Sequence, residues 1–381
     1  MRKTTRAWRQ AILLSVVCAS CAAIVTAQVR PRARELGLAP GIYPPGQLNA
    51  ITDVAGVRVG HTTVIEGSEV RTGVSAVLPH GGNLFREKVA GAVFVGNAFG
   101  KLAGSTQVAE LGTIETPIVL TNTLGVGVAM DAVVRYTLGQ PGNEQVRSVN
   151  ALVGETNDGG LNDIRGLHIT RQHVLDAITR ANGGEVAEGT VGAGTGTITY
   201  GWKGGIGTSS RTVPSGYLVG VLAQTNFGGN LTIAGVPIFR VLRAPPVAAS
   251  LWSSDSDLAT GDGSCMLIVA TDAPLDARDL GRLAARAVFA LGRTGSSYSN
   301  GSGDFAIAFS TSAEMRTRAG ETAPRTRQVL PTDAVSPLFQ AALEATEEAV
   351  YNSLLRATTV TSKFGTAEAI PIDRLRALLP K

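Results

Sequence analysis

The chain has 381 residues and a formal net charge of +4, from 34 basic side chains (Lys and Arg) against 30 acidic ones (Asp and Glu). Arg2, Lys3, Arg6 and Arg9 account for this whole excess, so the rest of the chain is near neutral and has no basic surface typical of nucleic-acid binding. Its 46 glycines follow no repeating period, which is typical of a tightly packed α/β or α+β protein with many sharp turns.

The first 27 residues form a basic segment, an apolar stretch over 11–25 and the small-residue site Val25-Thr26-Ala27. This order predicts a secretory signal peptide over 1–27 and therefore an exported protein, periplasmic or secreted. No later segment has the roughly 18 consecutive apolar residues of a membrane span. After this segment Cys265 is the only cysteine, so we expect no internal disulfide.

Residues 28–48 are rich in proline and lack periodicity, which predicts an extended N-terminal arm before a single domain over 49–381. Apolar runs predict strands over 57–64, 73–78, 91–95, 117–121, 195–202, 216–224, 264–270 and 304–310. Helical patterns predict helices over 106–111, 124–138, 168–180, 276–291, 337–356 and 373–379. Because strands and helices come in blocks, an α+β fold with mixed sheets under helices is favoured.

Capping signals mark two of these helices. Asp276 is placed as the N-cap of the helix over 276–291, and Gly292 stands where the residue after the helix belongs. Ser336 is the expected N-cap of the helix over 337–356, with Pro337 at its first position, where proline is tolerated.

The junction Gly261-Asp262-Gly263-Ser264 leads directly into the apolar run 265–270, after a polar segment over 243–263. Glycine and aspartate are ordinary at a loop-to-strand junction. The other interpretation makes Ser264 a nucleophile, and the Gly263–Ser264 bond a cleavage site. A serine without a histidine needs another activator, and a free α-amino group with a pKa of about 7.7–8.0 serves once Ser264 is an N-terminus.

The four histidines are His61, His80, His168 and His173, and no pair has metal-ligand spacing with a nearby carboxylate. No Gly-x-Ser-x-Gly element surrounds Ser264 either, so structural histidines are favoured over a Ser-His-Asp triad. The glycine-rich segment 203–211 lacks the order of a phosphate-binding loop. We therefore expect no metal and no organic cofactor.

Two further sites follow predicted strands. Ser302 and Asp304 lie on one face of an extended strand and can together orient a neighbouring amine, or Asp304 can simply hold a glycine-rich turn. Asn226 lies just after the strand predicted over 216–224. A carboxamide there can donate a hydrogen bond to an oxyanion, or it can be an ordinary turn residue that ends the strand.

Taken together, eight segments in order resemble the self-processing serine aminopeptidases, which include the L-aminopeptidase/D-esterase and the β-peptidyl aminopeptidases. The likeness runs from about residue 46 to 365. The matching segments are 49–61, 72–79, 117–123, 154–163, 203–211, 261–264, 300–304 and 344–349.

The resemblance implies a four-layer αββα sandwich like that of N-terminal-nucleophile hydrolases, with different connectivity. It implies a cut between Gly263 and Ser264, giving an α chain over 28–263 and a β chain over 264–381 that assemble as a tetramer of αβ units. Ser264 would be nucleophile and base, Asn226 would line the oxyanion hole, and Ser302 with Asp304 would assist near the amine.

Two departures from the family pattern stand out. Asp304 replaces a glutamate of some members, and Gly160 stands where certain members carry a tyrosine. The sequence thus predicts an exported aminopeptidase acting on small peptides, amides or esters through an acyl-enzyme on Ser264. The alternatives are an amidase or acyltransferase on the same scaffold, or a non-catalytic secreted binding protein.

Overall fold

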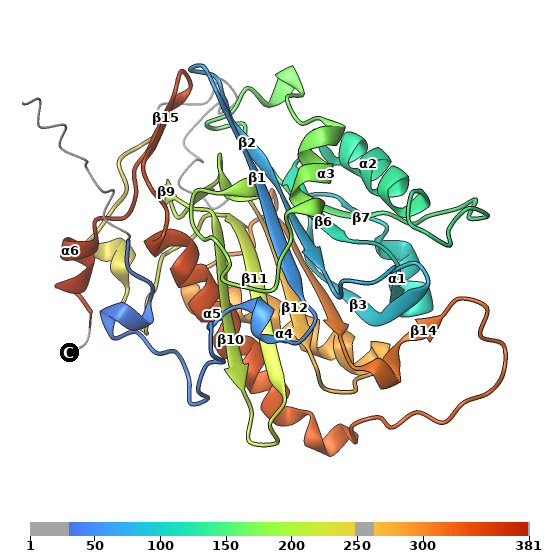
Figure 1. The fold of residues 1–381 in the computed structure, drawn as a ribbon. Coiled ribbons are helices and arrows are strands. Elements are labelled where there is room, and N and C mark those ends of the chain that lie inside the picture. Colours follow the sequence, from blue (N-terminus) through green and yellow to red (C-terminus); the bar gives the residue numbers. More distant parts are fainter. Residues whose placement is uncertain (1–29, 248–262, 380–381) are drawn as a thin grey trace, which may run out of the picture.

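The computed structural model describes residues 30–247 and 263–379, in which two stacked β-sheets lie between two helical layers (Figure 1). The first sheet has the order β1-β2-β6-β7-β4. Its strands are β1 (Arg58–Glu66), β2 (Val70–Leu78), β6 (Ile118–Asn122), β7 (Leu152–Thr156) and β4 (Leu102–Ala103). The second sheet has the order β10-β11-β12-β13-β3-β14, with β5 also paired to β3. Its strands are β10 (Ile206–Thr212), β11 (Leu218–Asn226), β12 (Ser264–Thr271), β13 (Gly303–Ser310), β3 (Glu87–Ala98), β14 (Thr317–Arg318) and β5 (Thr113–Ile114).

Each sheet has its own pair of covering helices. α2 (Val126–Leu138) and α3 (Arg171–Thr179) pack on the first sheet, and α4 (Ala277–Thr294) and α5 (Ser336–Leu355) on the second. The smaller elements are α1 (Ser105–Leu111), α6 (Ile372–Arg376) and two hairpins, β8 (Ile198–Thr199) with β9 (Trp202–Lys203) and β15 (Val360–Ser362) with β16 (Gly365–Ala367). Within the described residues no helix is long and apolar enough to cross a membrane.

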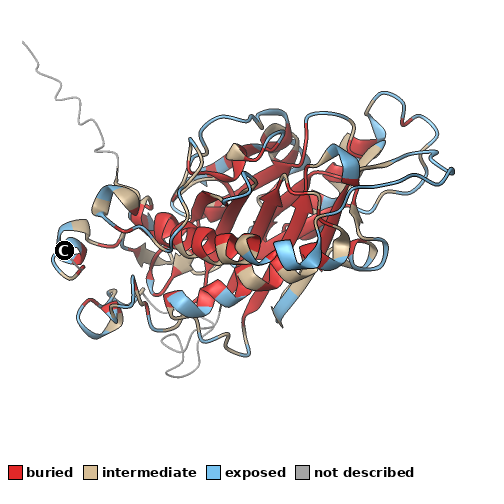
Figure 2. Ribbon diagram, turned by 90° about the horizontal axis from the view of Figure 1, so that it is seen from below, coloured by how far each residue is buried: buried red, intermediate tan, exposed pale blue. Residues whose placement is uncertain are grey.

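Three apolar layers hold the sandwich together, and β12 shows how one strand serves two of them. Leu267 and Val269 pack toward α4 and α5, whereas Met266 and Ile268 pack between the sheets. Burying each such side chain contributes about 1.5–3 kcal/mol. A strand covered on both faces needs a continuous apolar run, which is what 265–270 provides. Figure 2 shows the buried interior running through both sheets. The αββα fold expected from the sequence is confirmed.

The helix boundaries agree in part with the capping signals. Asp276 caps α4, accepting a hydrogen bond from the Asp279 amide at 2.9 Å. The expected end at Gly292 is wrong, because α4 continues to Thr294, which is buried, and closes on Gly295 in the left-handed conformation. The expected cap Ser336 is also wrong: α5 begins there, and Val335 occupies the cap position without a side-chain bond.

One strand prediction is wrong, and one strand of the second sheet was not predicted, each for a physical reason. The segment 195–202 is not one strand, because Tyr200 and Gly201 have φ angles of 53° and 78° and turn the chain back into a hairpin. β10 escapes detection because it is buried yet polar and small. Its small residues let α5 approach, since a Cβ on Gly207 would lie 1.9 Å from the Ala349 carbonyl oxygen.

A buried ionic cluster ties the N-terminal segment to α5. Arg211 is fully buried and contacts Glu348 at 2.7 Å and Glu344 at 3.4 Å. Arg34 reaches Glu348 at 3.1 Å from the segment before β1, and Asn49 donates to the same carboxylate. The segment preceding β1 is thereby held against the second helical layer.

We expect Glu348→Ala to lower the free energy of unfolding by about 3–5 kcal/mol, because the buried Arg211 would keep only the longer Glu344 contact and Asn49 would lose its acceptor. The measurement is urea unfolding in the Ser264→Ala background, so that a cut at Ser264 cannot complicate the transition. Glu69→Ala breaks the exposed Lys363–Glu69 pair and serves as control, with a loss below about 1 kcal/mol. Equal losses in the two variants would contradict the prediction.

Candidate active site at the start of β12

The candidate site lies where β12 begins, between two other strands of the second sheet. In the strand register Ser264 stands beside Asn226 of β11 on one side and Gly303 of β13 on the other. Ser264 alternates with Met266 and Ile268, so its hydroxyl is directed between the two sheets. Asn226 precedes Ser264 by nearly 40 residues and Gly303 follows it by nearly 40, and the pairing of the three strands brings them together.

Gly263 is held tightly against this junction. A Cβ on Gly263 would lie 2.1 Å from the Asn226 carbonyl oxygen, so only glycine fits. The Gly303 amide donates to the Gly263 carbonyl oxygen at 3.0 Å and lies 3.3 Å from the Ser264 hydroxyl oxygen. One backbone N–H therefore contacts both the carbonyl before Ser264 and the hydroxyl of Ser264.

Two hydrogen bonds fix the Asn226 carboxamide. Its Oδ1 accepts from the Ile198 amide at 2.9 Å, and its Nδ2 donates to the Asn157 carbonyl at 2.9 Å. Asn226 is 8% exposed. Because Oδ1 faces a backbone donor, Nδ2 is the end that faces acceptors, and one of its two N–H groups is used by Asn157.

Ser302 and Asp304 form a pair at the start of β13. The Ser302 hydroxyl donates to Asp304 Oδ2 at 2.8 Å, while Asp304 Oδ1 is buried without a hydrogen-bond partner in the described part of the chain. Burial raises the pKa of Asp304 to about 6, and the Ser302 bond opposes this shift. Burial, together with the Asp304 charge, also raises the pKa of the Cys265 thiol.

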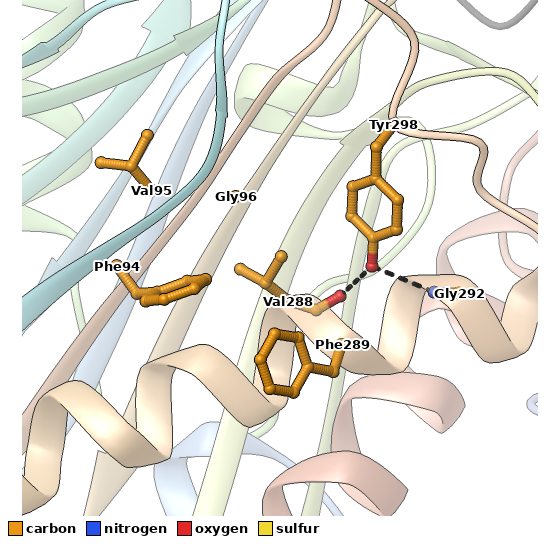
Figure 3. A pocket seen from close by; sticks show the side chains of 7 residues that line it. All are labelled: Phe94, Val95, Gly96, Val288, Phe289, Gly292 and Tyr298. Atoms are coloured by element: carbon orange, nitrogen blue, oxygen red, sulfur yellow. Dashed lines mark hydrogen bonds between the residues drawn. The ribbon is translucent and has the colours of Figure 1, made fainter.

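The loop before Ser302 is anchored from behind by Tyr298. Its hydroxyl donates to the Val288 carbonyl and accepts from the Gly292 amide at 3.2 Å, both on α4 (Figure 3). Asn97 of β3 donates to the Tyr298 carbonyl at 3.3 Å. The surrounding hollow, about 350 Å³, is lined by Phe94, Val95, Gly96, Val288, Phe289, Gly292 and Tyr298. Because the Tyr298 hydroxyl already has two partners on α4, Tyr298 holds in place the loop that carries Ser302.

The raised pKa of Asp304 makes a prediction for the uncut chain. Between about pH 4 and 6 the folded chain keeps a proton that the unfolded chain, with a carboxyl pKa of 3.8, has lost. Stability therefore falls as pH rises through this range. In a Ser264→Ala background, Asp304→Asn removes this fall. We expect its free energy of unfolding, relative to that of Ser264→Ala alone, to rise by about 2 kcal/mol between pH 4 and pH 8. Urea unfolding at both pH values measures it, and an unchanged pH dependence would refute it.

Glu155, at the end of β7, is a carboxylate that the sequence analysis did not single out. It is 2% exposed and accepts from the Lys101 amide at 2.9 Å and from the Thr123 hydroxyl. Gly100 lies between it and the site, since a Cβ there would be 3.3 Å from Glu155 Oε1 and 3.4 Å from Gly303 Cα. The available signal was an acidic residue at the end of an otherwise buried apolar strand.

Two further buried charged side chains were also missed. Asp158 and Lys203 are both fully buried; burial raises the pKa of Asp158 to about 6 and lowers that of Lys203 to about 7. Lys203 Nζ donates to the Gly194 and Gly204 carbonyls at 2.8 and 2.7 Å. Asp158 accepts from the Asn162 side-chain amide at 2.9 Å, and this bond fixes the loop in which the Asn157 carbonyl holds Asn226. Gly160 lies in the same loop, and its Cβ position would be 3.2 Å from Ile198.

The histidines have structural partners. His61 contacts the Ser75 hydroxyl at 2.8 Å, and burial lowers its pKa to about 4. His80 bonds the Glu87 carbonyl, His168 pairs with Asp163, and His173 closes the capping box of α3. In residues 30–247 and 263–379 no group of three metal-ligating side chains comes together. No triad partner for Ser264 is found among these contacts.

The two-sheet αββα sandwich is the layer order expected of the N-terminal-nucleophile hydrolase fold, and Ser264 begins a central strand of its second sheet. Residues 49–367 match the model of Peptidase family S58, and the chain belongs to this family. It is 42% identical to "Beta-peptidyl aminopeptidase BapA" of Sphingosinicella microcystinivorans over 376 residues, 92% of each chain. The chain is therefore a hydrolase with aminopeptidase activity.

Two solved structures share its fold at a TM-score of 0.83. The PH0078 protein from Pyrococcus horikoshii OT3 is 45% identical, with 91% of this chain and 98% of that one covered. The L-aminopeptidase D-Ala-esterase/amidase from Ochrobactrum anthropi is 37% identical, with 92% and 98% covered. That structure is described as a prototype for the serine aminopeptidases and a new variant of the Ntn hydrolase fold. The family resemblance stated from the sequence is confirmed.

Proposed function

We propose that this protein is an exported serine aminopeptidase that cuts its own Gly263–Ser264 bond and then uses Ser264 as an N-terminal nucleophile. The observation that carries the proposal is the Gly303 amide, which contacts both the Gly263 carbonyl oxygen and the Ser264 hydroxyl. A carbonyl that already accepts a fixed hydrogen bond is polarised for attack by a hydroxyl beside it.

Self-cleavage would begin with attack of Ser264 Oγ on the Gly263 carbonyl carbon. Negative charge then develops on the Gly263 oxygen, toward which the Gly303 N–H already points at 3.0 Å. Breaking the C–N bond transfers the acyl group from nitrogen to oxygen, and water hydrolyses the resulting ester. The products are a carboxylate on Gly263 and a free amino group on Ser264.

In the cut enzyme that amino group is the base. Its pKa of about 7.7–8.0 leaves much of it neutral near pH 8, able to take the hydroxyl proton as Oγ attacks a substrate carbonyl. Asn226 Nδ2 would donate to the oxyanion, and water would release the acyl group from Ser264. Asp304 alternates with Ala306 and Ala308, which face the helices, so the Ser302–Asp304 pair is suited to hold the backbone amine rather than the hydroxyl.

Substrate recognition would use Glu155. An aminopeptidase must hold the ammonium group of its substrate, and a buried carboxylate is the partner such a cation requires. Glu155 meets this need, lying across Gly100 from Gly303. The expected substrates are small peptides, amides or esters with a free amino terminus, and the names of the relatives, a β-peptidyl aminopeptidase and an L-aminopeptidase D-Ala-esterase/amidase, support this range.

Denaturing electrophoresis with N-terminal sequencing tests the proposal. We expect two bands from the purified wild type, the smaller beginning Ser-Cys-Met-Leu at Ser264. A panel of aminoacyl p-nitroanilides with L-α, D-α and β-aminoacyl groups would then define the preferred substrate. A single intact wild-type chain without activity on any of them would refute the mechanism.

Export and assembly complete the proposal. The predicted signal peptide over 1–27 lies outside the described residues, and it supports a periplasmic or secreted location, which fractionation of cells would establish. We propose a tetramer of αβ units, testable by light scattering after size-exclusion chromatography. Transfer of the acyl group to an amine in place of water is the alternative use of the same acyl-enzyme, and added amines would reveal it as a new amide product.

A further inference from the structure

Lys101 stands beside Glu155 in an arrangement that distinguishes its backbone from its side chain. The backbone N–H of Lys101 donates to Glu155 Oε1 at 2.9 Å, a well-formed hydrogen bond. The side-chain Nζ lies 3.5 Å from the same oxygen, and the Lys101 side chain is 54% exposed, whereas Glu155 is 2% exposed. The backbone N–H of Lys101 therefore fixes the position of the Glu155 carboxylate. The Lys101 ammonium makes only a long contact with that buried carboxylate, from an exposed side chain.

We propose that the Lys101 ammonium occupies the cation position of Glu155 while the site is empty and is displaced by the ammonium group of the substrate. This inference rests on the proposed role of Glu155. A buried carboxylate is costly without a cation, so an internal ammonium stabilises it in the absence of substrate. A long, exposed lysine side chain is suited to this task because it can swing into solvent at little cost.

Two consequences follow for specificity. Each substrate must compete with Lys101, so apparent affinity is lower than the carboxylate alone would give. A substrate without an ammonium group cannot take over the charge of Glu155, and Lys101 then stays in place and occupies the cation position. Lys101 is therefore a specificity-determining residue that favours substrates with a free amine.

The decisive experiment compares Lys101→Met with the wild type on one aminoacyl p-nitroanilide. We expect KM to fall about two- to fivefold, the range of an exposed ion pair, with kcat unchanged. The inhibition constant of a simple alkylammonium ion should fall by the same factor. The control is Lys363→Met, which removes the same charge from the exposed Lys363–Glu69 pair and should change neither constant. Lys101→Arg should behave like the wild type.

A rise in KM for Lys101→Met would overturn the inference, since it would mean that the side chain supports Glu155 instead of competing for it. An unchanged KM and inhibition constant would overturn it as well. Glu155→Gln separates this from failure of the proposed function. If that variant is still cut at Ser264 and hydrolyses the substrate with unchanged KM, the role of Glu155 itself is wrong.

Discussion

Ser264→Ala is expected to give a single uncut chain with no detectable aminopeptidase activity. Alanine lacks the hydroxyl that would attack Gly263 and, without the cut, no free amine forms at residue 264. Removing a catalytic nucleophile lowers kcat by factors on the order of a million in serine hydrolases. Mass spectrometry of the purified chain and turnover of aminoacyl p-nitroanilides measure the two effects separately.

Folding of the alanine variant must be verified in the same experiment, by thermal unfolding and circular dichroism. Ser264→Cys is the matched variant, because its thiol can attack the same carbonyl, and it should still be cut. An alanine variant that is processed at residue 264, or an uncut chain with wild-type turnover, would remove Ser264 from its proposed role.

Asn226→Ala is expected to lower kcat about 100- to 1000-fold with little change in KM, because the oxyanion would lose a fixed donor. The rate of self-cleavage should fall by a smaller factor than kcat, because the Gly303 amide still contacts the Gly263 carbonyl. Single-turnover and steady-state assays on the cut enzyme give kcat, and the rate of band splitting after a pulse of expression gives the cleavage rate.

Asn157→Ala provides the control for this variant. Asn157 holds Asn226 through its backbone carbonyl, while its side chain accepts only from the nearby Gly159 amide in the bonds seen here. Removing that side chain leaves the Asn226 contact in place, and we expect less than about a tenfold change in kcat. If both variants lose activity equally, the effect reflects the loop and not an oxyanion donor.

Much of this site could be predicted locally. The turn before Ser264 and the continuous apolar run after it indicated a buried strand with a hydroxyl at its mouth, and β12 starts at that residue. The spacing of Ser302 and Asp304 indicated one shared face, and the two side chains are hydrogen-bonded. These predictions depend on strand alternation and turn chemistry, which act over a few residues.

Other features were out of reach of a sequence pattern. β10 packs small polar residues against α5, so its burial leaves no apolar period to read. The Gly303 backbone N–H leaves no signal in the sequence, because any residue but proline has one. Its position beside Gly263 and Ser264 depends on the register between β12 and β13. Glu155 and Lys101 approach the site from the first sheet and from the connection leading to it, far along the chain from Ser264.

The amino-acid sequence alone predicted the candidate reacting groups, most of the strands and helices, and the family to which the chain belongs. Only the tertiary structure decided which backbone donor meets the Gly263 carbonyl, how the Asn226 carboxamide is turned and which cation covers Glu155. The physical reason is that strand register and side-chain burial are set by contacts between segments distant in sequence, where one residue of slip reverses every side chain.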